Sequence, residues 1–418
     1  MKVLILSINY WPEVTGIGAF TTYRAEHLAA AGHEVEVCTT FPYYPEWKVA
    51  SEYAGKLAAS EERNGVKIYR SYAFIPNRVT SLRRILHEGS FVASSLIRAI
   101  ARKRPDLLLV VSPPLGLALN AILLSRLWRI PYVFDVEDMQ PDAAAELNML
   151  PPWALKFLYK VESAAYRHAA LVSTLTNGMR KRIVDKGIPD DKVALFEARM
   201  DDSLADIEPE EGSAFRRRHG LENKFLATHS GNMGVKQGLD VIVDAAALNR
   251  SDESMLFLLV GDGSIRERIQ SRVAELGLCN VRFLPLLDAA DFRGLLAASD
   301  VCLLTQQKSV SEIAFPSKAV TYLSAGRPIV ASVNAECEIA QTLRESGAGK
   351  VVAAEDAEAL LAAIDELRGA DLGEYRQNAR EYATRRWSSA RVLGHLERSL
   401  ISVAAPGPNS LAQEGSTR

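Results

Sequence analysis

The sequence predicts an α/β protein built from two doubly wound, Rossmann-like domains. Short apolar runs, typical of buried parallel strands, alternate with helix-length segments, and this alternation starts again near residue 225. A chain of 418 residues is also longer than one ordinary domain. Two such domains bind ligands at the carboxyl ends of their strands, so we expect a cleft between them.

The first half shows the alternation from its start. Apolar runs predict strands at residues 3–8, 34–40, 66–71, 107–111, 132–136, 171–174 and 193–196. A helix is expected at residues 21–31, after a glycine-bearing loop. Residues 107–125 carry no charge and approach the length of a bilayer span, but Pro113 and Pro114 divide them into a strand and a helix. We therefore predict no transmembrane helix.

The second half repeats the architecture. Strands are predicted at residues 225–229, 255–260, 281–284, 301–305 and 329–332, with helices between them. The predicted domains are residues 1–200 and 201–374. A last long helix at residues 375–400 is expected to pack back toward the first domain. Residues 401–418, rich in Gly, Pro and Ser, are predicted to form a disordered tail.

The overall charge excludes a broad electrostatic attraction to nucleic acid, because 49 basic residues face 51 acidic ones. The four cysteines are far apart and show no Cys-x-x-Cys spacing, which is typical of reduced thiols in a cytoplasmic protein. Residues 78–104 are a local exception to the charge balance, with an apolar middle and a single acid, Glu88. Their basic residues are Arg78, Arg83, Arg84, Arg98, Arg102, Lys103 and Arg104.

Basic amphipathic helices of this kind lie on anionic membranes. We take Arg83, Arg84, Arg98 and Arg102 as the candidates for facing a membrane. The alternative is a core-facing helix with solvated ends. The membrane hypothesis places the protein at the inner face of the cytoplasmic membrane.

A diphosphate site is predicted in the stretch HSGNMGVKQGLD, residues 229–240. Gly231 and Gly234 allow the backbone to turn tightly and to approach a ligand, and the amides of the following helix attract an anion. Lys236 adds a full positive charge. The alternative is that these glycines only make a turn between a strand and a helix.

Two further stretches lie at the ends of predicted strands of the second half. The turn Gly261-Asp262-Gly263 follows one strand, and Pro316-Ser317-Lys318 begins a helix after another. Proline suits the first helical turn, where free amides point outward. Lys318 is therefore a candidate second cation for phosphate.

The first domain has its own candidate residues. Gly16 and Gly18 follow the first strand, but they do not form GxGxxG, and no acid ends the second strand, so a dinucleotide dehydrogenase is disfavoured. Acids cluster after the strand at residues 132–136, where they could bind sugar hydroxyls or stabilise positive charge; capping is the alternative for one of them. These acids are Asp135, Glu137, Asp138 and Asp142. The aromatic loop at residues 41–47 could stack on a sugar or pack over the sheet edge.

Taken together, these motifs resemble the family-4 retaining glycosyltransferases of the GT-B fold. The resemblance is closest to the branch that builds colanic acid and related exopolysaccharides, and it covers about residues 1–400. The motifs that carry it are NYWPEVTGIGAF, FPYYPEW, RRILHEGSFVASS, FDVEDMQPDA, SGNMGVKQGLD, VGDG and FPSKAVTYLSAGRP.

The resemblance implies a metal-independent hexosyltransferase without a cofactor. Such an enzyme moves a sugar from a GDP- or UDP-sugar to a saccharide acceptor with retention at the anomeric carbon. The basic segment adds the hypothesis of a lipid-linked acceptor at an anionic membrane surface. A nucleotide-sugar epimerase of the same architecture is the alternative function, and a non-catalytic sugar-nucleotide-binding protein is a third.

Carried over by residue, the resemblance assigns donor binding to loop and helix-start positions. These are Gly16, Gly18, Gly231, Asn232, Gly234, Lys236, Gly261, Asp262, Gly263, Ser317 and Lys318. Asp138 matches a position near the transferred sugar, and Lys236 is expected to stabilise the leaving diphosphate, so these two are the catalytic candidates.

Two positions depart from the family pattern. Asn232 stands where many members have an arginine, which leaves phosphate charge to Lys236 and Lys318. The Glu-x(7)-Glu pair of the wider family is absent, because its two positions hold Ile313 and Thr321. The second Glu usually holds the ribose, so the sequence does not identify the group that does so here.

Overall fold

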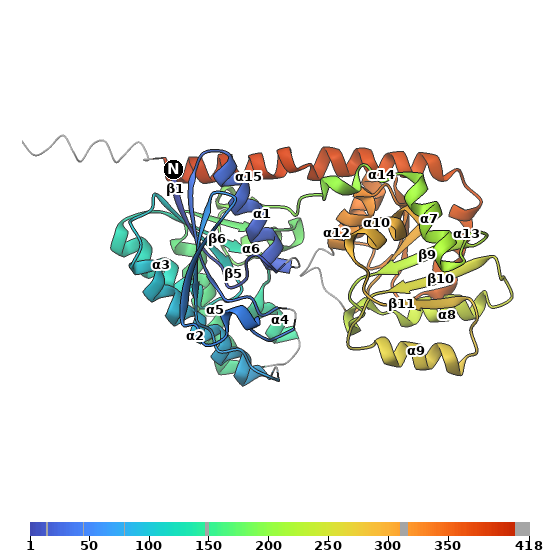
Figure 1. The fold of residues 1–418 in the computed structure, drawn as a ribbon, viewed down its shortest axis with the longest axis horizontal. Coiled ribbons are helices and arrows are strands. Elements are labelled where there is room, and N and C mark those ends of the chain that lie inside the picture. The colour runs from blue at the N-terminus through green and yellow to red at the C-terminus, as the bar shows by residue number, and fades with distance from the viewer. Residues whose placement is uncertain (14–15, 45, 79, 147–149, 310–316, 406–418) are drawn as a thin grey trace, which may run out of the picture. The chain divides into compact units, whose positions relative to one another are not determined.

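The computed structural model describes residues 1–13, 16–44, 46–78, 80–146, 150–309 and 317–405. The chain forms two compact units (Figure 1). The N-terminal unit contains Met1–Glu197 and the chain from Leu393 onward, and the C-terminal unit contains Ala198–Val392. Each unit is a sheet of parallel strands, apart from one antiparallel edge strand in the N-terminal unit, with helices on its faces; this confirms the predicted pair of doubly wound α/β domains.

The N-terminal unit is built on an eight-stranded sheet of order β3-β4-β2-β1-β5-β6-β7-β8, parallel except for β3. Its strands are β1 (Lys2–Leu6), β2 (Glu34–Thr40), β3 (Ala58–Arg63), β4 (Val66–Ser71), β5 (Leu107–Ser112), β6 (Tyr132–Val136), β7 (Leu171–Thr174) and β8 (Val193–Leu195). Its helices are α1 (Gly16–Ala30), α2 (Ser81–Ile100), α3 (Leu117–Trp128), α4 (Gln140–Glu146), α5 (Pro152–His168) and α6 (Asn177–Asp185), with 3₁₀ turns η1 (Ser51–Tyr53) and η2 (Asp190–Lys192). The central strands are continuous apolar runs because helices cover both faces of the sheet.

Two elements of this unit differ from the prediction. Strand β3 was not predicted, because its sequence AASEER is polar and lies at an exposed edge of the sheet. The turn Asn64-Gly65, with both residues at positive φ, joins β3 to β4 and is the sequence signal that marks this hairpin. Helix α1 starts at Gly16, so Gly16 and Gly18 belong to its first turn instead of a loop.

The C-terminal unit is built on a six-stranded parallel sheet of order β11-β10-β9-β12-β13-β14. Its strands are β9 (Phe225–Ser230), β10 (Met255–Val260), β11 (Val281–Leu284), β12 (Val301–Thr305), β13 (Ile329–Val333) and β14 (Gly349–Ala353). Its helices are α7 (Pro209–His219), α8 (Asp240–Leu248), α9 (Arg266–Glu275), α10 (Ala289–Ala298), α11 (Ser317–Ser324), α12 (Glu338–Ser346), α13 (Ala357–Arg368) and α14 (Leu372–Trp387), with 3₁₀ turns η3 (Asp202–Leu204) and η4 (Val235–Gln237). Strand β9 lies at the centre of the sheet, between β10 and β12.

The predicted single C-terminal helix is two helices. Helix α14 ends at Trp387, and α15 (Ser389–Ala404) follows after Ser388. Leu396 and Leu400 of α15 are buried in the core of the N-terminal unit, against residues of β1 and β2. Residues 401–404 of the predicted disordered tail are the end of α15, contrary to the prediction, and residues 406–418 lie outside the described residues.

The uncharged segment at residues 107–125 forms strand β5 and most of helix α3, as predicted. Among the described residues, no helix combines the length and the apolarity that crossing a bilayer requires.

Candidate functional site

The loops after β9 and β10 form one backbone platform at the carboxyl edge of the C-terminal sheet. The Gly231 amide donates to the Val260 carbonyl at 2.8 Å, and the Met233 amide donates to the Asp262 carbonyl at 2.8 Å. The Ile265 amide returns a hydrogen bond to the Met233 carbonyl at 3.1 Å. The two glycine-bearing stretches that the sequence analysis selected separately therefore hold each other in place.

Glycine is required here because backbone lies against backbone. Gly231, Gly261 and Gly263 have φ values of +111°, +133° and +155°, which other residues rarely adopt. A Cβ atom on Gly261 would lie 2.0 Å from the Gly231 carbonyl oxygen, and one on Gly263 would lie 2.5 Å from the Met233 carbonyl oxygen. Gly231 was predicted to allow a ligand to approach. Contact between the two loops accounts for Gly261 and Gly263, whereas a Cβ atom on Gly231 would lie 2.9 Å from Lys318 Cε, so Gly231 makes room for that side chain.

Substituting Gly261→Ala is expected to destabilise the C-terminal unit by about 2–3 kcal/mol, because the new methyl group forces the two loops apart and strains the backbone. Gly277→Ala is the matched control: it also has positive φ, +61°, but its Cβ meets nothing within 4 Å. The control is expected to lose only about 1 kcal/mol. Urea unfolding measures both, and equal losses would contradict the loop-contact explanation.

Lys318 supplies positive charge beneath this platform. It lies in the first turn of α11, and its Nζ donates to His229 Nε2 at 3.1 Å and to the Asn232 carbonyl at 3.2 Å. Burial lowers the pKa of Lys318 to about 8. Burial, and then the Lys318 cation, lower the pKa of His229 well below its usual value. His229 is therefore neutral and accepts at Nε2, which places its proton on Nδ1.

The helix that carries Lys318 is tied to the central strand. The Tyr322 hydroxyl is buried and accepts a hydrogen bond from the Ser230 amide at 2.9 Å. His229 and Tyr322 are thus supporting residues that the sequence analysis missed. In the sequence, the feature that could have identified His229 is a polar residue at the end of a strand that begins with apolar residues.

Lys236 lies on the same loop but points its charge into solvent. It is exposed in the 3₁₀ turn η4, and its carbonyl accepts from the Gln307 amide at 3.0 Å, which fixes the turn to the end of β12. Helix α8 begins after this turn with Asp240, whose carboxylate is bound by Arg268 at 2.7 Å and Arg272 at 2.8 Å. The acid in the first turn of α8 offsets its dipole, so the positive charge at this loop comes from the lysines.

The remaining predicted donor positions of the C-terminal unit also lie at this edge. Asn232 is exposed, and its carbonyl binds Lys318. The Gly234 amide donates to Gln237 Oε1 at 3.1 Å, and the Asp262 carboxylate accepts from the Gly263 amide at 2.8 Å. Ser317 is exposed at the first residue of α11. Pro316 and Ile313 lie outside the described residues.

In the N-terminal unit, Glu13 organises the carboxyl edge of the sheet. Its buried carboxylate accepts from the amides of Tyr43 and Tyr44, both at 2.9 Å, and from Asn9 Nδ2 at 2.7 Å. Burial raises its pKa despite these donors. Gly18 lies directly against it, because a Cβ on Gly18 would be 2.9 Å from Glu13 Cβ. Gly18 thus permits a close internal contact, and Glu13 is another residue that the sequence analysis missed.

The acidic cluster after β6 divides into inward and outward members. Arg24 Nη1 binds Asp135 at 2.6 Å and Glu137 at 2.7 Å, and its Nη2 donates to the Phe196 carbonyl at 2.7 Å. All three charged side chains are buried. Burial raises the pKa of Glu137 to about 8, although Arg24 opposes the shift. Asp138 is partly exposed at the same edge.

The aromatic loop after β2 mostly packs over the sheet edge, which was one of the two predicted alternatives. Phe41 and Tyr43 are buried. The Tyr43 hydroxyl lies 3.0 Å from Nε2 of His87, whose Nδ1 donates to the Phe74 carbonyl at 2.7 Å. Since burial lowers the pKa of His87, its neutral ring accepts from Tyr43. Tyr44 is the exposed aromatic of this loop.

Two of the four membrane-facing candidates do not face outward, contrary to the prediction. Arg98 Nη2 donates to the Ala59 carbonyl and to Ser60 Oγ, both at 2.8 Å, and the Arg102 guanidinium lies 4.2 Å from the ring centre of Tyr69. Arg98 therefore binds the edge strand β3, and Arg102 lies against its neighbour β4. Arg83 and Arg84 are exposed, as expected.

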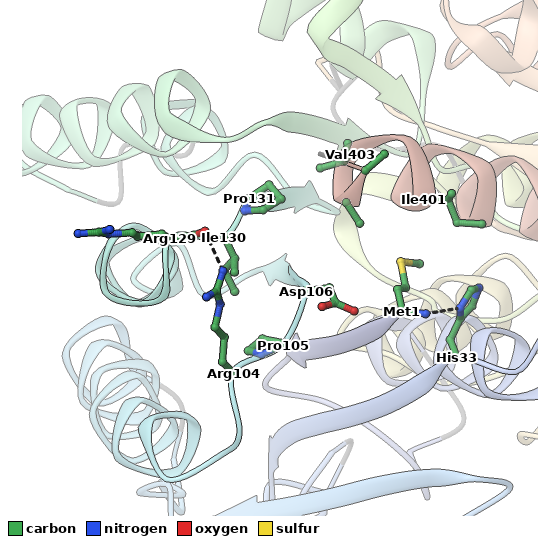
Figure 2. Close-up of a pocket in the computed structure, with 12 residues that line it drawn as sticks. Met1, His33, Arg104, Pro105, Asp106, Arg129, Ile130, Pro131, Ile401 and Val403 are labelled. Atoms are coloured by element: carbon green, nitrogen blue, oxygen red, sulfur yellow. Dashed lines mark hydrogen bonds between the residues drawn. The ribbon is translucent and has the colours of Figure 1, made fainter. Parts of the chain in front are cut away.

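The N-terminal unit also has cavities at both edges of its sheet. One of about 920 Å³ lies at the amino edge, between the starts of β5 and β6 and the end of α15, and Figure 2 shows Arg104, Arg129 and Ile401 around it. It contains none of the predicted site residues. A smaller cavity of about 150 Å³ lies at the carboxyl ends of β2 and β4 and is lined mainly by apolar side chains.

Comparisons with known proteins agree with this geometry. Residues 15–198 match the family model described as a glycosyl transferase 4-like domain, and residues 224–369 match glycosyl transferases group 1. The chain is 32% identical over 405 residues to WcaI of Escherichia coli K12, which is described as a "putative colanic acid biosynthesis glycosyl transferase", and the match covers 94% of this chain and 98% of WcaI.

Solved structures share the fold at low identity. HepE of Anabaena in complex with UDP superposes with a TM-score of 0.71 at 18% identity, covering 96% of this chain and 100% of HepE. Sucrose-phosphate synthase of Thermosynechococcus elongatus superposes with a TM-score of 0.74 at 17% identity, covering 96% of this chain and 99% of that structure.

Proposed function

This chain belongs to the family-4 glycosyltransferases of the GT-B fold, and we propose that it moves a hexose from a UDP- or GDP-sugar to a saccharide acceptor in exopolysaccharide biosynthesis. The observation that most directly supports a nucleotide-sugar donor is the pair of lysines at the backbone platform formed by the loops after β9 and β10. Lys318 is held beneath the loop, and Lys236 is exposed on it. Both suit the charge of a nucleoside diphosphate.

These cations also support a retaining transfer without a protein nucleophile. The bond between the anomeric carbon and the diphosphate oxygen breaks first, and Lys236 and Lys318 stabilise the negative charge that develops on the leaving diphosphate. The acceptor hydroxyl then attacks from the same face, and its proton passes to a diphosphate oxygen. Because the lysines supply the positive charge, we propose that the reaction uses neither a metal ion nor a cofactor.

The N-terminal unit is proposed to bind the acceptor. Its carboxyl edge holds the partly exposed Asp138, which we assign to hydroxyl groups of the reacting sugars. The cavity of about 150 Å³ at the same edge is lined by Phe41, Val49, Tyr53 and Ile75, and an apolar cavity of this volume holds a benzene-sized group. An apolar pocket at the same edge as Asp138 suits a saccharide that is linked to a lipid. The enzyme would bind such an acceptor at an anionic membrane surface.

Nucleotide binding is expected to weaken as the pH rises above about 8, because Lys318 then loses its proton. Below that value the ammonium group attracts the diphosphate, and the bound anion shifts the loss of the proton to higher pH. Lys318→Arg keeps its charge across this range and is expected to bind equally at pH 7 and pH 9. Titration calorimetry with UDP and GDP measures the effect, and a flat profile in the unmodified protein would contradict it.

Thermal unfolding with UDP and with GDP tests the proposed donor. A nucleotide at about 100 times its dissociation constant stabilises the folded protein by about 2.7 kcal/mol, so one of the two should raise Tm by several degrees. If neither UDP nor GDP raises Tm, the proposed nucleotide-sugar donor is wrong.

Product analysis separates the transferase from the epimerase alternative. Acceptor-dependent release of the nucleoside diphosphate identifies a transferase, whereas an isomerised free donor identifies an epimerase. The epimerase alternative depended on the acids near Asp138 as acid and base groups. Two of them, Asp135 and Glu137, are buried against Arg24 and have a structural role.

A further inference from the structure

Helix α5 exposes an unusual surface for a helix that packs on a sheet. Trp153 and Phe157 lie four residues apart on its outer side, with 76% and 60% of their surface exposed. Lys156 and Lys160 are exposed on the same side. Aromatic rings next to lysines on one helix face are typical of helices that lie at a membrane interface, where the lysine stems extend toward the headgroups.

Helix α3 continues this apolar character. Leu119, Leu123 and Leu127 follow one another at four-residue spacing, and each is about half exposed or more, at 54%, 48% and 58%. Arg126 is exposed among them. The fold itself does not need these leucines, because α3 packs inward through other residues such as Leu117.

Helix α2 adds a third apolar stripe. Leu82, Leu86 and Ile97 are exposed at 68%, 53% and 74%, and the exposed residues between them on the same side are Gly89 and Ala93. Its core contacts are made from the opposite side of the helix, where Phe91 is fully buried. Arg83 and Arg84 are exposed in the first turns.

These three stripes belong to one side of the N-terminal unit. Asn120 of α3 donates to the Val92 carbonyl of α2 at 2.8 Å, and Arg126 of α3 lies 3.5 Å from His168 of α5. Figure 1 shows α2, α3 and α5 grouped together, away from α1 and α15. We call the outward surfaces of α2, α3 and α5 the apolar face. Exposed apolar side chains gathered on three neighbouring helices are typical of an interaction site.

We propose that the apolar face docks the enzyme on an anionic lipid bilayer, with Trp153 and Phe157 inserted among the lipids. The charges support a lipid partner. The helices α2, α3 and α5 contain two acids, of which Glu162 is buried and Glu88 pairs with Arg84. The exposed charges are therefore nearly all basic, which favours anionic headgroups and opposes pairing with a second copy of the same face.

Docking in this way would bring the acceptor to the enzyme. A helix that follows a parallel strand begins at the carboxyl edge of the sheet, so Leu82 and Leu119 lie toward the edge that holds Glu13 and Asp138. A saccharide on a membrane lipid would reach this edge without leaving the bilayer surface. This last step depends on the proposed function, but the docking itself does not.

Vesicle co-sedimentation tests the docking. The full chain is mixed with vesicles of phosphatidylglycerol and phosphatidylcholine, and the double variant Trp153→Ser/Phe157→Ser is expected to bind about 10- to 100-fold more weakly. Lys156→Glu/Lys160→Glu should lose binding mainly at low salt, since charge attraction is screened at high salt. Leu286→Ser is the control, because Leu286 is 70% exposed in the C-terminal unit.

Three outcomes would overturn the proposal. The unmodified protein does not sediment with the vesicles, or the aromatic double variant binds as well as the control, or sedimentation velocity shows a dimer that the double variant dissolves. The UDP and GDP thermal shifts, measured without vesicles, keep the two proposals apart. If the protein binds vesicles but neither nucleotide shifts Tm, the docking proposal stands and the donor proposal is wrong. If a nucleotide shifts Tm but the protein does not bind vesicles, only the docking proposal is wrong.

Discussion

Replacing Lys236 with alanine is expected to slow glycosyl transfer by about 100- to 1000-fold, which is the usual effect of removing one pre-positioned charge from a developing anion. Lys236 is exposed on a loop whose backbone the Gln307 amide fixes to the end of β12, so its side chain starts from a fixed position beside the proposed diphosphate site. Affinity for UDP or GDP should fall by about 10- to 100-fold, the loss expected for one charged hydrogen bond. Acceptor-dependent nucleotide release and titration calorimetry measure the two quantities.

The matched control for this variant is Lys224→Ala. Lys224 immediately precedes β9, at the amino edge of the same sheet, and is expected to leave both quantities unchanged. Lys236→Arg should recover part of the loss, because the charge is kept. If Lys236→Ala behaves like the control, Lys318 alone carries the diphosphate and the assignment of Lys236 is wrong.

Replacing Arg24 with methionine is expected to destabilise the N-terminal unit by about 3–5 kcal/mol, the usual loss when one partner of a buried ion pair is removed. Arg24 is buried between Asp135 and Glu137 and also binds the Phe196 carbonyl. Without it, two carboxyl groups remain in the interior with no cation, and a negative charge that stays on either of them is uncompensated. Urea unfolding at pH 7 measures the loss.

A surface pair provides the comparison for Arg24. Lys67 pairs with Glu34 on the same sheet, but both side chains are about half exposed, at 47% and 49%. Lys67→Met should therefore leave the urea midpoint nearly unchanged, because water and salt screen an exposed ion pair. Adding Asp135→Asn and Glu137→Gln to Arg24→Met should recover stability, because the uncompensated charges are then gone. A similar small loss for Arg24→Met and Lys67→Met would show that the buried network contributes little.

Most of the fold follows from periodicity, and the exceptions have physical causes. Apolar runs of four to six residues predicted the buried strands of both sheets, since a strand covered on both faces needs apolar side chains throughout. The edge strands β3 and β14 were not predicted, because both are only partly buried and neither has an apolar run of this length. The break between α14 and α15 at Ser388 was not predicted, because no proline or glycine lies there.

The candidate site was predictable where the backbone imposes the residue type. Positive φ and close packing require Gly231, Gly261 and Gly263, so these positions stand out in the sequence. Positions set by tertiary contact did not stand out. The carboxylate of Glu13 holds a loop thirty residues further along the chain, and Arg98 turns toward a strand that was not predicted. No local pattern encodes either contact.

Helix α15 has a consequence for how the protein is made. The C-terminal unit is one continuous stretch of chain, so it can fold as soon as its last residues leave the ribosome. The N-terminal unit emerges first but lacks Leu396 and Leu400, which complete its core. Its core therefore stays incomplete, with apolar surface uncovered, until α15 has been synthesised. Chains that stop before α15 are expected to be substrates for chaperones and proteases, even though they already contain both loops of the backbone platform.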